Sequence, residues 1–173
     1  MPRTSIRQLV ATERPLVTPL AYDALSARLI ERAGFKGVAI GGSGLFASRY
    51  GLPDIGLGAL GEMLAGVRDI VAATDLPVVV DGDDGYGDNR SVAHMVETYR
   101  RLGVSGIVLE DQMLVAKQPG DSGATAVVTP EIMEGKIRTA VAGCAGSDLQ
   151  IIARCDALRL EGMDAALRRG ERY

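Results

Sequence analysis

Residues 78–87 read VVVDGDDGYG, an apolar run that ends abruptly in acidic residues and glycines. The valines predict a strand buried on both faces, because parallel strands covered on both sides lose the alternation of polar and apolar residues. Asp81 and Asp83 follow where the strand ends, and Gly85 and Gly87 allow a sharp turn that leaves room for a ligand. The stretch therefore predicts a buried parallel strand with a polar site at its carboxyl end.

Asp81 and Asp83 are candidate metal ligands. Carboxylates packed this closely repel one another and stay ionised most readily when a cation lies between them. Hard oxygen ligands suit Mg²⁺, with Mn²⁺ as the alternative, better than zinc. The competing interpretation is a polar loop whose acids cap the next helix. For Asp88, directly before a predicted helix, capping is the better interpretation.

The composition is that of an ordinary soluble globular protein. The chain has 173 residues, of which 47% are hydrophobic and 24% charged, enough for one domain with a core. A net charge of −3 leaves no basic stripe for nucleic acid, and no apolar run approaches the roughly 20 residues of a membrane helix. No secretory signal is visible, so we expect a cytoplasmic protein in which Cys144 and Cys155 are reduced.

Strands and helices alternate along the chain, which predicts a single α/β domain over residues 1–173 with a parallel sheet. Strands are expected at 16–18, 37–40, 78–80, 106–109 and 149–153. Helices are expected at 5–12, 21–33, 60–74, 89–102, 130–142 and from 162 onward, several of them closed by glycine or opened by proline.

Two architectures are compatible with this alternation. Five strands and this length satisfy an open, doubly wound sheet, whereas a TIM (β/α)₈ barrel needs about 250 residues, so the chain would hold only about its first five units. The polar groups decide between them: Ser43, Asp81, Asp83, Glu110 and Arg154 each follow a strand, one strand after another. An open sheet concentrates its site where the strand order reverses, but a barrel spreads it over successive strand ends. We therefore predict a partial barrel.

Glu110 and Arg154 extend the acid cluster to neighbouring strands. Glu110 supplies a third carboxylate within reach of the other two if its strand is adjacent, and three carboxylates acting partly through water suit Mg²⁺. The planar fork of Arg154 matches a substrate carboxylate or phosphonate. The alternative for Arg154 is an ion pair with Asp156 or Glu110.

Three further positions carry weaker signals. The backbone of residues 42–44, Gly-Ser-Gly, offers N–H groups to an anion, although short glycine loops are common at strand ends. Asp54 closes a Gly-Leu-Pro-Asp turn that either brings it back over the site or leaves it solvated. His94 lies within a predicted helix, far from every strand end, and is interpreted as a surface residue.

Six motifs together resemble the isocitrate lyase and phosphoenolpyruvate mutase superfamily, in its order and at its spacing. They are PLAYDALSA at 19–27, GSG at 42–44, GLPD at 51–54, DGDDGYG at 81–87, LEDQ at 109–112 and IAR at 152–154. The resemblance implies a Mg²⁺-dependent carbon–carbon lyase or decarboxylase that acts on a small α-keto or α-hydroxy carboxylate through a metal-stabilised enolate. It also implies that Asp81, Asp83 and Glu110 hold the metal, mostly through water.

The resemblance implies roles for the remaining candidates as well. The backbone groups that would bind the α-keto acid portion belong to Ser43, Gly44 and Leu45. Arg154 would bind the substrate carboxylate or phosphonate, Asp54 would act on the metal's water shell or the reacting group, and Tyr22 would line the pocket.

The loop at 116–123, AKQPGDSG, departs from the family pattern. Lyases of the family carry Lys-Lys-Cys-Gly-His there, and this loop has neither cysteine nor histidine, so isocitrate or methylisocitrate cleavage by the usual mechanism is not expected. Oxaloacetate decarboxylases and phosphonate mutases or hydrolases of the family fit better, with Lys117 or water as a proton donor. The length and glycines of the segment 117–129 permit it to close over the site.

Family chains continue through strands six to eight and a final helix that packs on a neighbouring subunit, which implies a homo-oligomer. This sequence stops at Tyr173, within the helix after the fifth strand. A third interpretation is therefore a truncated, catalytically incomplete barrel with exposed sheet edges.

Overall fold

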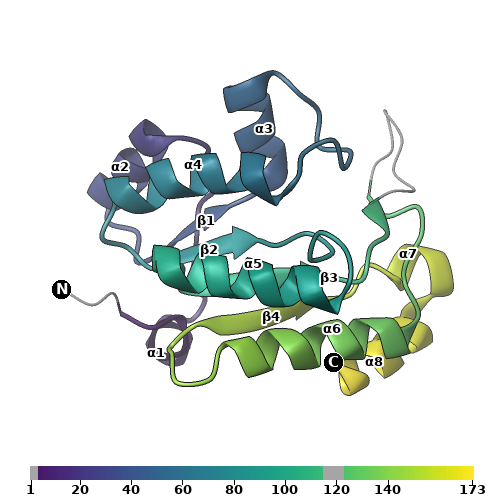
Figure 1. The fold of residues 1–173 in the computed structure, drawn as a ribbon. Coiled ribbons are helices and arrows are strands. Elements are labelled where there is room, and N and C mark those ends of the chain that lie inside the picture. Colours follow the sequence, from purple (N-terminus) through teal and green to yellow (C-terminus); the bar gives the residue numbers. More distant parts are fainter. Residues whose placement is uncertain (1–3, 115–122) are drawn as a thin grey trace.

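The computed structural model describes residues 4–114 and 123–173. The strands are β1 (Val38–Ile40), β2 (Val78–Asp81), β3 (Gly106–Glu110) and β4 (Gln150–Arg154). The helices are α1 (Ile6–Thr12), α2 (Ala24–Arg32), α3 (Gly42–Tyr50), α4 (Leu60–Ala73), α5 (Asn89–Leu102), α6 (Pro130–Gly143), α7 (Leu158–Glu161) and α8 (Met163–Arg172). Figure 1 shows the strands side by side with helices against them.

The four strands pair in the order β1-β2-β3-β4, and every pair is parallel. The order follows the chain without reversal, so the part of the chain that the structure describes has no switch point of the kind that defines a doubly wound sheet. This sequential arrangement confirms the predicted barrel type of α/β fold. The carboxyl ends of all four strands consequently lie at one edge of the sheet.

The predicted strand at 16–18 is wrong. Contact with β1 is made two residues after that range, where Leu20 forms an isolated parallel bridge with Ala39. The N–H of Ala39 donates to Pro19 O (2.9 Å), and the N–H of Ala21 donates to Ala39 O (2.8 Å). Pro19 has no N–H of its own, but its carbonyl accepts the hydrogen bond from Ala39 and so takes part in the pairing. This bridge, followed by α2, represents the first of the five predicted units.

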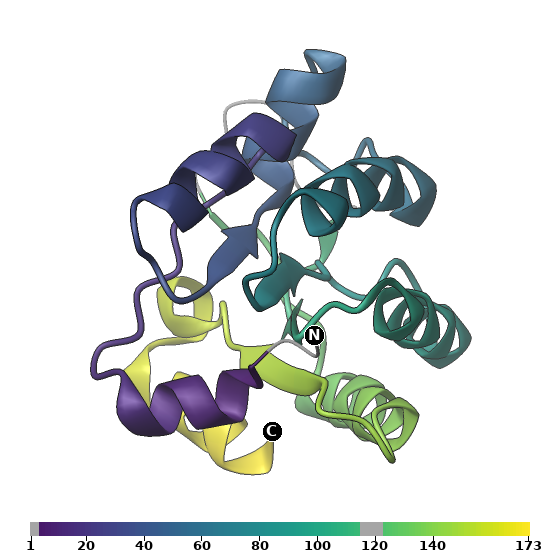
Figure 2. The ribbon, with the colours of Figure 1, turned by 90° about the vertical axis from the view of Figure 1, so that its left-hand side faces the viewer.

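The core lies between one face of the sheet and a layer of three helices. Figure 2 shows α4, α5 and α6 beside one another on that face. The strand residues that point toward them are fully buried, namely Val38, Ile40, Val78, Val80, Ile107 and Leu109. Val79 and Val108, on the opposite face, are only partly buried. The expectation of a strand buried on both faces therefore fails for β2, because the helix layer covers one face only.

Local helix signals in the sequence were reliable. Helix α5 has the predicted bounds, its N-cap Asp88 accepts from the N–H groups of Arg90 and Ser91, and Gly103 ends it with φ +80°. Pro130 opens α6 as predicted. His94 is exposed on α5, and Cys144 and Cys155 are both free and partly buried. No helix within the described ranges is long and apolar enough to cross a membrane.

Helix α3 is the main element that the sequence did not predict. It begins directly after β1 with Gly-Ser-Gly, and glycine is a weak helix former. Packing stabilises it instead, because Leu45 is fully buried and its side chain lies so close to Gly66 that a Cβ there would be 2.5 Å from Leu45 Cδ1. Phe46 is buried beside it. The short α7 was likewise not predicted.

Candidate active site

Three of the predicted residues meet at the carboxyl edge of the sheet. Asp81 ends β2, Glu110 ends β3 and Arg154 ends β4, with Glu110 directly opposite Arg154 in the strand register. Arg154 Nη1 lies 2.9 Å from Glu110 Oε2. Strand pairing thus brings an acid–arginine pair together beside the end of β2.

Asp83 is turned toward the same edge by an uncommon backbone conformation. Its φ is +49°, in the left-handed region that non-glycine residues rarely adopt, and its N–H donates to Asp81 Oδ1 (3.1 Å). Gly85 follows with φ +87°, and a Cβ there would lie 2.4 Å from Val92 Cγ2, so the tight turn requires glycine at that position. Such strain is typical of positions that serve a site.

Asp54 is brought back over the edge. Ser43 Oγ donates to Asp54 Oδ2 (2.7 Å), and the Asp54 carboxylate lies against Gly42, where a Cβ would be 3.2 Å from Oδ1. Of the two alternatives for this turn residue, the structure therefore favours the one in which Asp54 faces the start of α3.

The start of α3 presents backbone N–H groups at the same place. The N-cap Gly41 makes no side-chain cap, and the N–H groups of the first turn, including those of Ser43 and Gly44, have no acceptor within the helix. Leu45 differs, because its N–H donates to Gly41 O (3.3 Å) and its side chain is in the core. The structure brings Ser43 and Gly44 to the site but commits the Leu45 N–H to the helix.

Tyr22 lies beside this helix start. Its Cβ would be 3.4 Å from a Cβ on Gly44, and its carbonyl accepts from Ser48 Oγ (3.0 Å). Its side chain is half exposed. Tyr22 is therefore close to the predicted anion-binding backbone of Gly44.

The acids are buried with too little positive charge to balance them. Asp83 is 8% exposed, and burial together with the charges of Asp81, Asp54 and Glu110 raises its pKa to about 8. Glu110 is 3% exposed, and burial raises its pKa to about 7 although Arg154 opposes the shift. Burial also raises the pKa of Asp81. A cation among these groups would relieve their mutual repulsion.

Both alternative partners of Arg154 are present at once. Besides Glu110, the guanidinium contacts Asp156 Oδ1 through Nε (3.2 Å) and Nη2 (2.9 Å). The Arg154 side chain is nevertheless 45% exposed, so it is oriented by its two acids and open to solvent on the remaining side. Gln112 Nε2 donates to Glu110 Oε1 (2.7 Å), which holds the other oxygen of that carboxylate.

The donor set fits hydrated Mg²⁺ better than a directly chelated metal. Within residues 4–114 and 123–173, no group of three or more histidine, cysteine, aspartate or glutamate side chains is placed to hold a metal ion. The candidate ligands near Asp83 are all carboxylate oxygens, and their charges are close enough to raise its pKa. Mg²⁺ keeps several of its waters and reaches carboxylates through them, so the acids need not touch one ion.

Sequence reasoning gave no role to Gln112 and considered Asp156 only as an alternative ion-pair partner of Arg154, although the structure places both on the Glu110–Arg154 pair. Gln112 belongs to the LEDQ motif and Asp156 follows the IAR motif, so their position two residues after a site residue was the available signal. The predicted proton donor Lys117 and the rest of residues 115–122 lie outside the described residues.

Comparison with known proteins gives consistent results. The sequence profile described as phosphoenolpyruvate phosphomutase matches residues 6–173. The chain is 40% identical over 168 residues to 2,3-dimethylmalate lyase of Eubacterium barkeri, covering 97% of this chain and 58% of the lyase. It therefore spans little more than half the length of that relative.

Two solved structures extend this similarity. An oxaloacetate acetylhydrolase in complex with the product oxalate has a TM-score of 0.81 and 37% identity, over 89% of this chain and 53% of that one. A phosphonopyruvate hydrolase in complex with oxalate and Mg²⁺ has a TM-score of 0.76 and 34% identity, over 90% of this chain and 53% of that one. The chain shares its fold with enzymes that handle small carboxylates and phosphonates.

Proposed function

The chain belongs to the phosphoenolpyruvate phosphomutase family, and from this premise we propose that it carries the metal-binding and anion-binding part of a Mg²⁺-dependent carbon–carbon lyase or decarboxylase. The substrate class is a small α-keto or α-hydroxy carboxylate. One observation carries the proposal. The carboxylate of Asp83 is buried in a strained turn, and this burial and the charges of Asp81, Asp54 and Glu110 at the same edge of the sheet raise its pKa.

Asp81, Asp83 and Glu110 would hold Mg²⁺, or Mn²⁺, largely through its water shell. The ion would stabilise the negative charge that develops on the substrate's keto oxygen when a neighbouring bond breaks. Glu110 is prepared for this role because Gln112 and Arg154 fix its two oxygens. The similarity to a phosphonopyruvate hydrolase that was solved with oxalate and Mg²⁺ supports the choice of metal.

The start of α3 and Arg154 would bind the two ends of the substrate. The N–H groups of Ser43 and Gly44, which have no acceptor within the helix, lie at its positive end, which favours a carboxylate. Each Nη of Arg154 carries a second N–H beyond the one directed at an acid, and these would reach a substrate carboxylate or phosphonate from the exposed side. Leu45 would not bind the substrate through its N–H, because that group already donates to Gly41 O within the helix.

Asp54 and Tyr22 are the proposed catalytic neighbours. Asp54 Oδ2 accepts from Ser43, which leaves its other oxygen, Oδ1, to orient water or take up a proton near the reacting group. Tyr22 would line the pocket at its rim. We further propose a cytoplasmic homo-oligomer, following the family pattern.

A phosphonate mutase or hydrolase is the second candidate. The similarity to a phosphonopyruvate hydrolase supports it, and the guanidinium fork of Arg154 suits phosphonate as well as carboxylate. The loop sequence AKQPGDSG at 116–123, without cysteine or histidine, is compatible with either candidate.

The test is turnover by the purified chain with Mg²⁺ and with a chelator. Oxaloacetate is assayed for released pyruvate, and 2,3-dimethylmalate is assayed for released pyruvate and propionate. Phosphonopyruvate is followed by phosphorus NMR. Because Mg²⁺ alone decarboxylates oxaloacetate slowly, rates are compared with Asp83→Asn and with the matched surface variant Glu97→Gln, whose parent residue pairs with Arg100 and Arg101 on α5.

We expect chelator-sensitive turnover that Asp83→Asn abolishes and Glu97→Gln retains. Mg²⁺-dependent binding of oxalate, a planar dianion shaped like the enolate of pyruvate, is measured in parallel by calorimetry. A chain that neither turns over these compounds nor binds oxalate with Mg²⁺ would contradict the proposal.

A further inference from the structure

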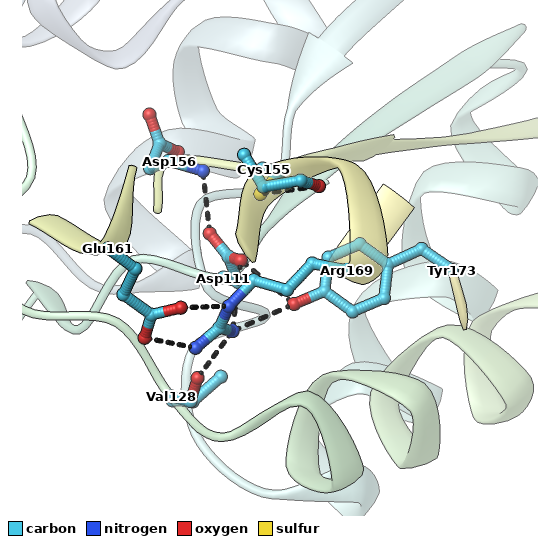
Figure 3. Close-up of polar contacts among 8 residues, drawn as sticks. Asp111, Val128, Cys155, Asp156, Glu161, Arg169 and Tyr173 are labelled. Carbon is cyan, nitrogen blue, oxygen red and sulfur yellow. Dashed lines mark hydrogen bonds and ion pairs between the residues drawn. The ribbon is translucent and has the colours of Figure 1, made fainter. Parts of the chain in front are cut away.

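Another buried carboxylate lies directly behind the site. Asp111 follows Glu110 at the end of β3 and is 0% exposed. A buried carboxylate is unfavourable unless hydrogen bonds and positive charge compensate it. Figure 3 shows the groups that do so, which are the Asp156 N–H after β4, Arg169 on helix α8, and Tyr173 directly after that helix.

Helix α8 supplies the compensation on one side. Tyr173 Oη donates to Asp111 Oδ2 (2.8 Å), and Arg169 Nη1 lies 3.3 Å from the same oxygen. Arg169 is itself buried and is held by a two-pronged pair with Glu161 (2.6 and 2.8 Å) and by Val128 O (2.8 Å). These contacts hold the Arg169 guanidinium in place independently of Asp111.

The other oxygen of Asp111 leads toward the site. The N–H of Asp156 donates to Asp111 Oδ1 (2.7 Å), and Asp156 Oδ1 in turn accepts from Nε and Nη2 of Arg154. The backbone N–H of Asp111 also donates to Arg154 O (3.2 Å). Asp111 thus holds the chain on both sides of Cys155, between Arg154 and the acid that orients it.

We propose that Asp111 is a positioning residue that sets the orientation of the Arg154 guanidinium, with Arg169 and Tyr173 of α8 holding Asp111 in place. The inference rests on the proposed function for the statement that Arg154 binds substrate. The orientation of Arg154 itself can be measured without any substrate.

A purely structural role, docking of α8, is served by a separate contact. Arg172, on the same helix, pairs with Glu131 (2.8 Å) and with Glu134 of α6 and makes no contact with Asp111. A substitution of Arg172 therefore loosens α8 while leaving Asp111 and its two oxygens unchanged, which provides a matched control.

The first measurement is the hydrogen-exchange rate of the Arg154 Nε–H by nitrogen-15 NMR on the full chain, with the signal assigned by Arg154→Lys. Asp111→Asn replaces an acceptor by a donor, and Tyr173→Phe removes one hydroxyl only. We expect exchange about tenfold faster in Asp111→Asn and about threefold faster in Tyr173→Phe. Arg172→Gln and Tyr50→Phe, whose parent hydroxyl bonds Glu62 O far from Asp111, should leave the rate unchanged.

The second measurement is Mg²⁺-dependent oxalate binding by calorimetry on the same variants. Tyr173→Phe should weaken binding about threefold to tenfold while Arg172→Gln has no effect. Unchanged Arg154 exchange in a folded Tyr173→Phe variant, or an equal change in Arg172→Gln, would overturn the positioning role. If the wild-type chain neither binds oxalate nor turns over the assayed compounds, the proposed function fails, and the exchange rates still decide the role of Asp111.

Discussion

The helix-covered face of the sheet and its carboxyl edge belong to the same strands, but the face buries apolar side chains and the edge buries carboxylates. On the covered face Val80, Ile107 and Leu109 are fully buried among apolar side chains. One to three residues further along, Asp83 and Glu110 are buried as well, but with carboxylates as neighbours and with raised pKa values. Burial stabilises the fold on the face and is unfavourable at the edge.

The contrast indicates that the edge is maintained for binding rather than for stability. A chain has no structural need to place like charges where water is scarce, and such arrangements cluster at functional sites. Substitutions on the face should therefore lower stability, whereas charge removal at the edge should not.

The largest expected effect is on the covered face. Ile107→Ala should lower the free energy of unfolding by about 2–5 kcal/mol, because it removes buried methyl groups and leaves a cavity beneath the helix layer. Urea denaturation measures this change. Ile132→Ala, at a half-exposed position on α6, is the control and should shift the free energy by at most about 0.5 kcal/mol. Equal losses in the two variants would mean that the face is not the core.

A smaller loss is expected where the face meets the edge. Gly85→Ala places a Cβ against Val92 in a left-handed backbone conformation, so it should cost about 1–3 kcal/mol. Gly34→Ala is the matched control, since Gly34 is also left-handed (φ +89°) but has open space around it. The difference between the two variants in thermal unfolding isolates the packing part of the effect. A Gly85→Ala loss no larger than that of the control would contradict the tight turn.

The smallest effect, and of opposite sign, is expected at the edge itself. In the absence of metal, Asp83→Asn should leave the free energy of unfolding unchanged or raise it by about 1 kcal/mol, because it removes a charge that Asp81, Asp54 and Glu110 repel. Denaturation in chelator measures this. A loss as large as that of Ile107→Ala would show that Asp83 belongs to the structural core.

The sequence predicted best what depends on neighbours along the chain. The valine run of β2, the cap and stop of α5 and the strand-end positions of Asp81, Glu110 and Arg154 all follow from local patterns. These patterns were sufficient to choose a barrel-type order and to locate the site edge.

What the sequence could not predict depends on tertiary contacts. Helix α3 has a poor local propensity and exists because Leu45 and Phe46 are buried. Pairing at Leu20 rather than at 16–18 is set by the position of β1. Arg169 reaches Asp111 from 58 residues away, and no spacing rule in the sequence connects them.

The central claim is that the carboxyl edge is a Mg²⁺ site, and the shift of the thermal unfolding midpoint with Mg²⁺ tests it most directly. At a concentration ten times the dissociation constant, Mg²⁺ should raise the midpoint of the wild-type chain and of Glu97→Gln by about 3–5 °C. The midpoint of Asp83→Asn should not move. Equal shifts in all three proteins, or none in the wild type, would contradict the claim.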